Sequence, residues 1–150
     1  MAWACAVASA EVLDISSIYR HRGGATHSTP TDLDVWERHA QAGAILGMAE
    51  RTLSESELTY LAARWGRVPR ARAALCRSAL KNIGRGTQKA AETAFKRHCG
   101  ARLGLHVLAM QLAGSGTAAF QTRFNRQMDP LYRGVIGKLE PVLLGHGLMV

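Results

Sequence analysis

The 150-residue sequence has little of several features that define common protein classes. Its three cysteines, Cys5, Cys76 and Cys99, are odd in number and far apart. They therefore encode no disulfide framework and fit a reducing cytoplasm. No run approaches the roughly 18 uncharged apolar residues that a membrane span requires. Aromatic residues make up 6% of the chain, which argues against a protein that stacks single-stranded bases.

The composition that remains is that of a folded domain. Hydrophobic residues make up 47% and charged residues 20% of the chain, which excludes a wholly disordered or collagen-like protein. The length suits one domain with one core. Residues 1–31 end in paired glycines, hydroxyl side chains and Pro30 without apolar periodicity. We expect them to form an N-terminal tail and linker, and residues 32–150 to form one helical domain.

Charge is distributed unevenly along the chain. Residues 1–66 carry five basic and eight acidic side chains, a net charge of −3. Residues 67–150 carry fourteen basic and three acidic side chains, a net charge of +11. The overall net charge of +8 therefore conceals an acidic N-terminal part and a strongly basic C-terminal part. Such an asymmetry suggests separate tasks for the two parts.

The basic residues are densest between Arg67 and Arg102. Ten arginines and lysines lie there against one acid, Glu92. A solvated face without any partner is the plain explanation for scattered charges of this kind. A one-sided excess over a third of the domain favours a polyanionic partner instead, and DNA is the first candidate.

Helical signals follow one another along the domain. Asp32 or Thr31 is a suitable cap for a helix to about Glu50, and the sequence Ser54-Glu55-Ser56-Glu57 is a capping box for a helix that Gly66 ends. Pro69 opens a further helix, which the Asn82-Ile83-Gly84 sequence ends. Thr87 caps a helix to about His98. Since no alternating β-branched run and no hairpin signal is present, the expected fold class is all-α.

Residues 103–128 have the pattern of a helix-turn-helix. Leu105, Leu108, Ala109 and Leu112 follow one another at i, i+3, i+4 and i+7, and a tight break at 113–115 precedes a second helix. Such a second helix projects its first turns into the major groove, where base edges are readable. Gln121 is suited to adenine, and Arg123 or Arg126 to guanine or phosphate. The candidate DNA-contacting residues are Lys96, Arg97, Arg102, Ser115, Gly116, Thr117, Gln121, Arg123 and Arg126.

The same residues carry a resemblance to a known family. The Leu108-Ala109-x-x-Leu112 sequence followed by Gly114-Ser115-x-Thr117 resembles the helix-turn-helix of sigma factor region 4. With Trp36-x-x-His39, Glu57-x-x-Tyr60 and Leu139-x-Pro141, residues 33–150 resemble small helical phage proteins grouped with Q-type late-gene transcription antiterminators. The resemblance implies binding beside a promoter and loading onto RNA polymerase, with nascent RNA as a further partner, followed by terminator readthrough in a bacterial cytoplasm.

Alternatives from other classes stay open. If the protein has no antitermination activity, it is either an ordinary helix-turn-helix transcription factor or a basic helical adaptor that binds protein or RNA. We expect no enzyme, because no cysteine or histidine has an activating neighbour in the sequence. We expect no cofactor and no metal either: His98, Cys99 and His106 lie close together but lack zinc-ligand spacing. Trp65, and the other aromatic residues at helical spacing, are expected in the core.

Overall fold

The computed structural model describes residues 35–145, and side chains from residue 43 onward. Every regular element in these residues is an α-helix, so the predicted all-α class is confirmed there. The expected tail, residues 1–31, lies outside the described residues. The helices are α3 (Val35–Thr52), α4 (Glu55–Arg64), α5 (Pro69–Ile83), α6 (Gln88–His98), α7 (Leu105–Gln111) and α8 (Thr117–Gly145).

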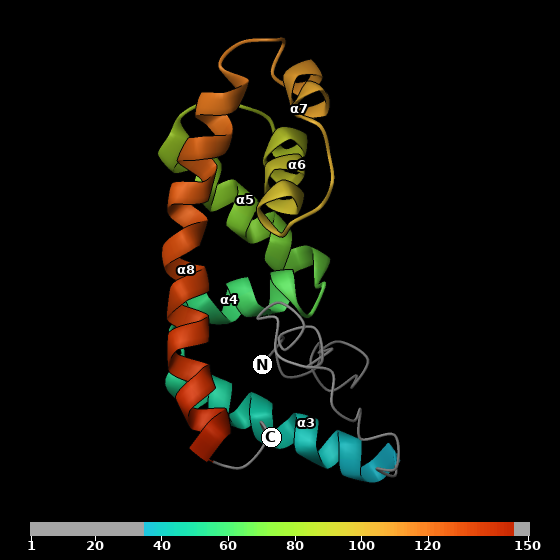
Figure 1. The fold of residues 1–150 in the computed structure, drawn as a ribbon, viewed down its shortest axis with the longest axis vertical. Helices are drawn as coiled ribbons and strands as arrows, with labels where there is room; N and C mark the ends of the chain where they lie inside the picture. Colours follow the sequence, from blue (N-terminus) through green and yellow to red (C-terminus); the bar gives the residue numbers. More distant parts are fainter. Residues whose placement is uncertain (1–34, 146–150) are drawn as a thin grey trace.

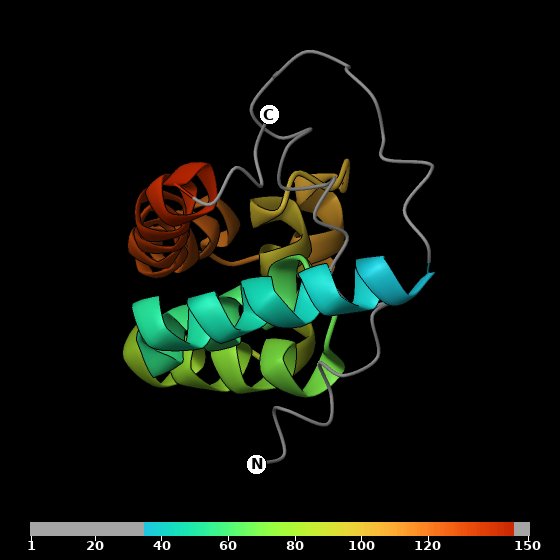
Figure 2. The same cartoon turned by 90° about the horizontal axis from the view of Figure 1, so that it is seen from below.

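One long helix organises the domain. α8 has 29 residues and contacts each of the other five helices (Figure 1). α5, α6 and α7 pack beside its first half, whereas α3 and α4 pack beside its second half. The view from below places α5 and α6 on two different sides of the bundle, with α8 along a third (Figure 2). No helix in the described part of the chain is both long and apolar enough to cross a membrane.

Local chemistry sets the helix ends where the sequence predicts them. The capping box at α4 is complete: the Ser54 amide donates to Glu57 Oε2 over 2.8 Å, and the Glu57 amide donates to Ser54 Oγ over 3.4 Å. Pro69 begins α5, and Gly84 ends it with a φ of 76°. The Thr87 hydroxyl accepts from the Ala90 amide and caps α6. These predicted boundaries are confirmed.

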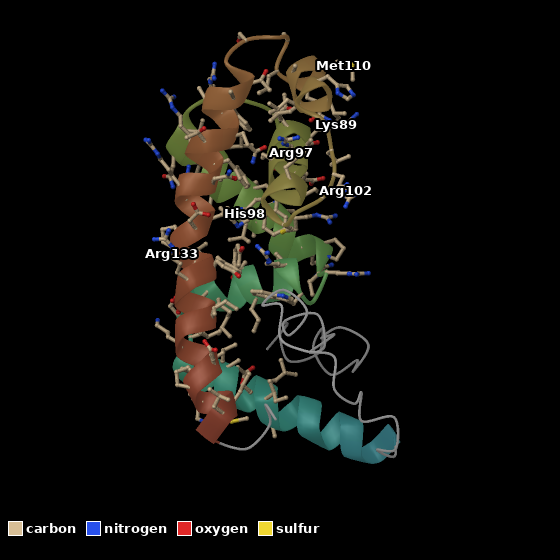
Figure 3. All side chains as sticks on the ribbon, in the orientation of Figure 1. Lys89, Arg97, His98, Arg102, Met110 and Arg133 are labelled. Carbon is tan, nitrogen blue, oxygen red and sulfur yellow. The ribbon has the colours of Figure 1, made fainter. Side chains whose placement is uncertain are left out.

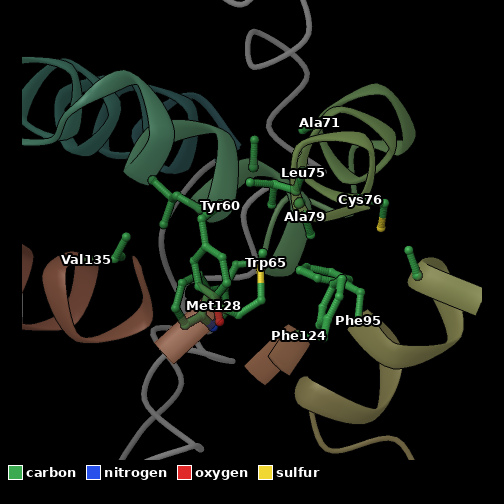
Figure 4. Packing of buried hydrophobic residues seen from close by; sticks show 14 of the residues in the cluster. Tyr60, Trp65, Ala71, Leu75, Cys76, Ala79, Phe95, Phe124, Met128 and Val135 are labelled. Atoms are coloured by element: carbon green, nitrogen blue, oxygen red, sulfur yellow. The ribbon is translucent and has the colours of Figure 1, made fainter. Parts of the chain in front are cut away.

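The core combines aromatic, aliphatic and alanine side chains (Figure 4). Trp65, Phe95, Phe120 and Phe124 are all buried, which confirms their expected packing role. The ring of Tyr60 is nearly perpendicular to those of Trp65 and Phe95, with ring centroids 6.0 Å and 6.2 Å apart. Both α5 and α6 bury alanines, and the two helices pack against each other. The side chains of Trp36 and His39, two residues of the family resemblance, lie outside the described ones.

The C-terminal third differs from the sequence interpretation. The sequence predicts a helix-turn-helix over residues 103–128, yet α8 continues past Met128 as a single helix through Pro130 and Pro141. Both prolines are exposed, so water can satisfy the carbonyls whose amide partners they remove. The buried stripe continues past them, and its burial outweighs the two lost hydrogen bonds. That stripe consists of Phe120, Phe124, Met128, Val135, Leu139 and Leu143.

The helix-turn-helix itself stays a prediction. α7 has seven residues, and five residues, 112–116, join it to α8 in place of a three-residue turn. Ala113, Gly114 and Gly116 have φ values of 52°, 76° and 60°, so the connection reverses through left-handed backbone. α7 packs against α6 as well as α8. The structure therefore provides two consecutive helices at the expected place, without establishing the motif.

Candidate nucleic-acid interface

The first turns of α8 present a narrow exposed strip. Ala118, Ala119 and Thr122 are exposed there, with Arg123 and Arg126 beside them. Neither arginine forms an ion pair with any described residue. Small side chains let a helix approach a groove closely, while arginine supplies the donors that pair with guanine or phosphate. The start of α8 thus combines both properties on one face.

α5 carries a second row of cations. Arg70, Arg77 and Lys81 are exposed at i, i+7 and i+11 and therefore share one face of the helix, over about 16 Å. Ala74 and Ser78 separate them, and α5 contains no acidic residue. None of the three cations forms an ion pair with a described side chain. Like the strip on α8, this row is exposed to solvent and contains no carboxylate.

Side-chain amides join the two rows. Asn82 Nδ2 donates to Gln127 Oε1 over 3.0 Å, and Gln127 Nε2 donates to the Ala79 carbonyl over 3.3 Å. The C-terminal end of α5 is thereby fixed beside the first half of α8. We treat the exposed cationic sides of these two neighbouring helices as one candidate surface. We call this surface the α5–α8 face. Its cations are Arg70, Arg77, Lys81, Arg123 and Arg126.

A loop contact holds the upper end of this face in place. Arg85 in the α5–α6 loop donates from a terminal nitrogen to the Gly116 carbonyl, which directly precedes α8, over 2.9 Å. Gly86 has a φ of 102°, and a Cβ there would lie 2.6 Å from the Phe120 ring. Arg85 and Gly86 in this loop therefore make contacts within the domain. Ser115 and Gly116 are exposed, and Thr117 is half-buried.

Gln121 and Arg97 serve the interior instead of the surface. Gln121 is 9% exposed, and its Nε2 donates to the Ala94 carbonyl of α6 over 3.1 Å. Its Oε1 accepts from Arg97 Nε over 3.2 Å, and Arg97 also donates to the Leu103 carbonyl. With both ends of its amide engaged, Gln121 presents no group to an adenine. We therefore leave Gln121 and Arg97 out of the proposed DNA contacts.

Lys96 and Arg102 lie on a different side from the arginines of α8. Both are exposed, and Lys96 projects from α6 in line with Lys89. Figure 3 places Lys89 and Arg102 on one side of the molecule and Arg133 of α8 on the other. The predicted site residues therefore divide into two surfaces, of which one adjoins α5 and the other adjoins α7. Sequence order suggested a single surface.

A buried polar cluster connects α4, α6 and α8. The Tyr60 hydroxyl accepts from Arg64 over 2.8 Å and lies 2.7 Å from His98 Nε2, while His98 Nδ1 lies 3.7 Å from Asp129 Oδ1. Burial, assisted by the charge of Arg64, lowers the pKa of His98 to about 4. Burial raises the pKa of Tyr60 far above its ordinary range. Both groups are neutral near pH 7, and the cluster stabilises the packing.

Burial keeps the thiols of Cys76 and Cys99 protonated. Burial raises the pKa of the Cys76 thiol to about 12, with nearby Glu92 adding to it, and burial also raises that of Cys99. A neutral thiol is a poor nucleophile. Within the side chains described, no group of three His, Cys, Asp or Glu residues comes together as metal ligands.

Comparison with known proteins adds no relative. No protein-family model, no curated protein and no solved structure matches the chain.

Proposed function

We propose that the protein is a DNA-binding regulator of phage transcription that acts as an antitermination factor on RNA polymerase. The supporting observation is the α5–α8 face, on which two neighbouring helices carry five exposed cations that form no ion pair with a described side chain. A surface of this kind attracts a polyanion and releases its counterions on binding. Duplex DNA offers regularly spaced phosphates to such a surface.

The two helices have different tasks in this proposal. α8 enters the major groove with its small exposed side chains, and Arg123 and Arg126 contact guanine or phosphate. Arg70, Arg77 and Lys81 hold the adjacent backbone and fix the orientation of the domain. Ser115 and Gly116 lie at the α8 start, where exposed helix amides favour phosphate. Gln121 keeps α8 seated on α6.

The antitermination step rests on the family resemblance. It requires that the DNA-bound protein transfers to RNA polymerase and changes its response to terminators, with nascent RNA as a further partner. An ordinary helix-turn-helix transcription factor needs the same DNA contacts and no such transfer. Transcription across a terminator with purified polymerase separates the two: we expect readthrough only in the presence of the protein and a particular upstream sequence.

Salt-titrated binding tests the DNA interface. Fluorescence anisotropy of a labelled duplex should give a logarithmic salt dependence with a slope of about −4.5 if all five cations contact phosphates. Competition among duplexes of different sequence then measures preference. An affinity that is indifferent to salt would exclude this interface. It would favour the second candidate, a basic adaptor for a protein partner, which the exposed apolar residues of α7 support.

A further inference from the structure

Among the described side chains, the exposed large apolar residues are concentrated on α7, the shortest described helix. Three large apolar residues are exposed in the part with described side chains, and two of them, Leu105 and Met110, lie on the seven-residue α7 at 44% and 73% exposure. Leu108 is the one buried residue of α7 and anchors it. On the exposed part of the helix surface, His106 and the half-buried Ala109 lie between Leu105 and Met110. Such concentration is typical of a binding surface.

Cations border this apolar side. α7 packs against α6, whose exposed row carries Lys89 and Lys96, and Arg102 lies in the segment between the two helices. Figure 3 shows Met110, Lys89 and Arg102 on the same side of the molecule. None of the three cations is paired with a described residue. The surface therefore combines an apolar centre with a basic border, and we call it the α6–α7 face.

This combination favours a protein over a nucleic acid. Phosphates gain nothing from contact with Leu105 and Met110, and α7 has no Phe, Tyr or Trp on which a base could stack, its one ring being the exposed imidazole of His106. An acidic peptide segment that also has apolar side chains can contact the apolar centre and the basic border at the same time. Methionine suits such a contact because its flexible side chain adapts to different apolar shapes.

We propose that the α6–α7 face binds an acidic segment of a partner protein, whose leucine-like side chains cover Met110 and Leu105 while its carboxylates meet Lys89, Lys96 and Arg102. This surface is separate from the α5–α8 face, so the domain binds its protein partner while the other face holds DNA. The inference does not depend on DNA binding. It gives the cations of α6 a partner that the DNA proposal does not provide.

A peptide binding assay with the full-length protein tests the proposal. The probe is a short fluorescent peptide of glutamate and leucine, and its matched control replaces each leucine by serine. We expect the leucine peptide to bind at least about tenfold more tightly, because only it buries the apolar centre. Equal binding of the two peptides would show a purely electrostatic attraction and overturn the proposal.

Variants locate the binding surface. The double variant L105S/M110S and the double variant K89E/R102E should each weaken peptide binding at least about tenfold. Leu144→Ser is the matched apolar control, since Leu144 is 54% exposed near the end of α8, and it should change the affinity less than about twofold. Retained helical circular dichroism confirms folding. Peptide binding that survives L105S/M110S would overturn the proposal.

DNA binding by the same variants separates the two proposals. L105S/M110S should bind duplex DNA as the unchanged protein does, because α7 lies outside the α5–α8 face. Loss of DNA binding in this variant would place α7 in the DNA interface and overturn the separate protein surface. Failure of the unchanged protein to bind DNA, with peptide binding intact, would remove the proposed function and leave this inference standing.

Discussion

Arg97 of α6 donates from its Nε to Oε1 of Gln121 on α8 over 3.2 Å, and Gln121 in turn donates to the Ala94 carbonyl over 3.1 Å. The two helices are thus connected by a buried amide that the sequence had suggested for base recognition. Because both the oxygen and the nitrogen of the Gln121 amide form hydrogen bonds in the interior, Gln121 stabilises the fold. It is a spacer between α6 and α8 and positions the exposed arginines of α8.

Replacing Gln121 by Leu should therefore destabilise the fold. The loss of its hydrogen bonds, which leaves Arg97 Nε without its acceptor in a half-buried place, should lower the free energy of unfolding by about 1–3 kcal/mol. Urea unfolding measures this. The neighbour Thr122, exposed and bonded within its own helix, is the control, and Thr122→Ala should stay within about 0.5 kcal/mol. A change in base preference without loss of stability would return Gln121 to the DNA interface.

The helix ends were predictable from the sequence because short-range chemistry determines them. The Ser54 capping box, the Pro69 start, the Gly84 stop and the Thr87 cap all act within a few residues. Their hydrogen-bond partners can be read from the sequence. The burial of Phe120 and Phe124 was equally predictable, since helical periodicity places both on one side of α8.

The candidate site was less predictable because contacts distant in the sequence assemble it. Gln121 borders the apolar stripe of α8, so helical periodicity alone does not determine whether its side chain is buried or exposed. Its burial depends on the hydrogen bond to the Ala94 carbonyl, 27 positions away in the sequence. The join of α5 to α8 depends on Asn82 and Gln127, which are 45 positions apart. The shared face of Arg70, Arg77 and Lys81 follows from their spacing on the predicted helix. The position of α5 beside α8 does not follow from the spacing of residues in the sequence.

Removing two cations from α8 should weaken duplex binding and leave the fold intact. R123A/R126A should lower the affinity at least about tenfold and reduce the magnitude of the salt slope by about 2. K96A/R102A removes the same charge from the other side and should change the affinity less than about twofold. Anisotropy titrations at several salt concentrations, with circular dichroism for folding, make the comparison. Equal losses in both variants would indicate a diffuse electrostatic attraction without a defined face.

Gly86 holds the loop beside the α8 start, and a methyl group there should be costly. Its φ of 102° and the distance of 2.6 Å from the added Cβ to the Phe120 ring predict that Gly86→Ala lowers the free energy of unfolding by about 1–3 kcal/mol. Gly137 within α8 is the matched control, since a Cβ there meets nothing within 4 Å. Gly137→Ala should stabilise the protein by about 0.5–1 kcal/mol. Thermal unfolding of both variants tests the pair, and similar melting temperatures would contradict the close packing at Gly86.

The buried His98 should make the stability fall in mild acid. Its pKa is lowered to about 4 in the folded protein, by burial and then by Arg64, against an ordinary value of 6.5 in the unfolded chain. The unfolded chain therefore binds the proton first. The contribution of His98 is complete above about pH 6.5 and is lost as the pH falls toward about 4, by roughly 3 kcal/mol in all.

A His98→Gln variant isolates this contribution from that of the carboxylates. Glutamine keeps a polar group near the Tyr60 hydroxyl and does not titrate, so the variant should be less stable than the unchanged protein near pH 7. The difference between the two should shrink as the pH falls from about 6.5 toward about 4, because the unchanged protein alone loses the His98 contribution. Urea unfolding at a series of pH values measures it. A difference that stays constant over this interval would mean that His98 titrates in the folded protein as it does in the unfolded chain, with its ring open to water and not enclosed beside Tyr60 and Asp129.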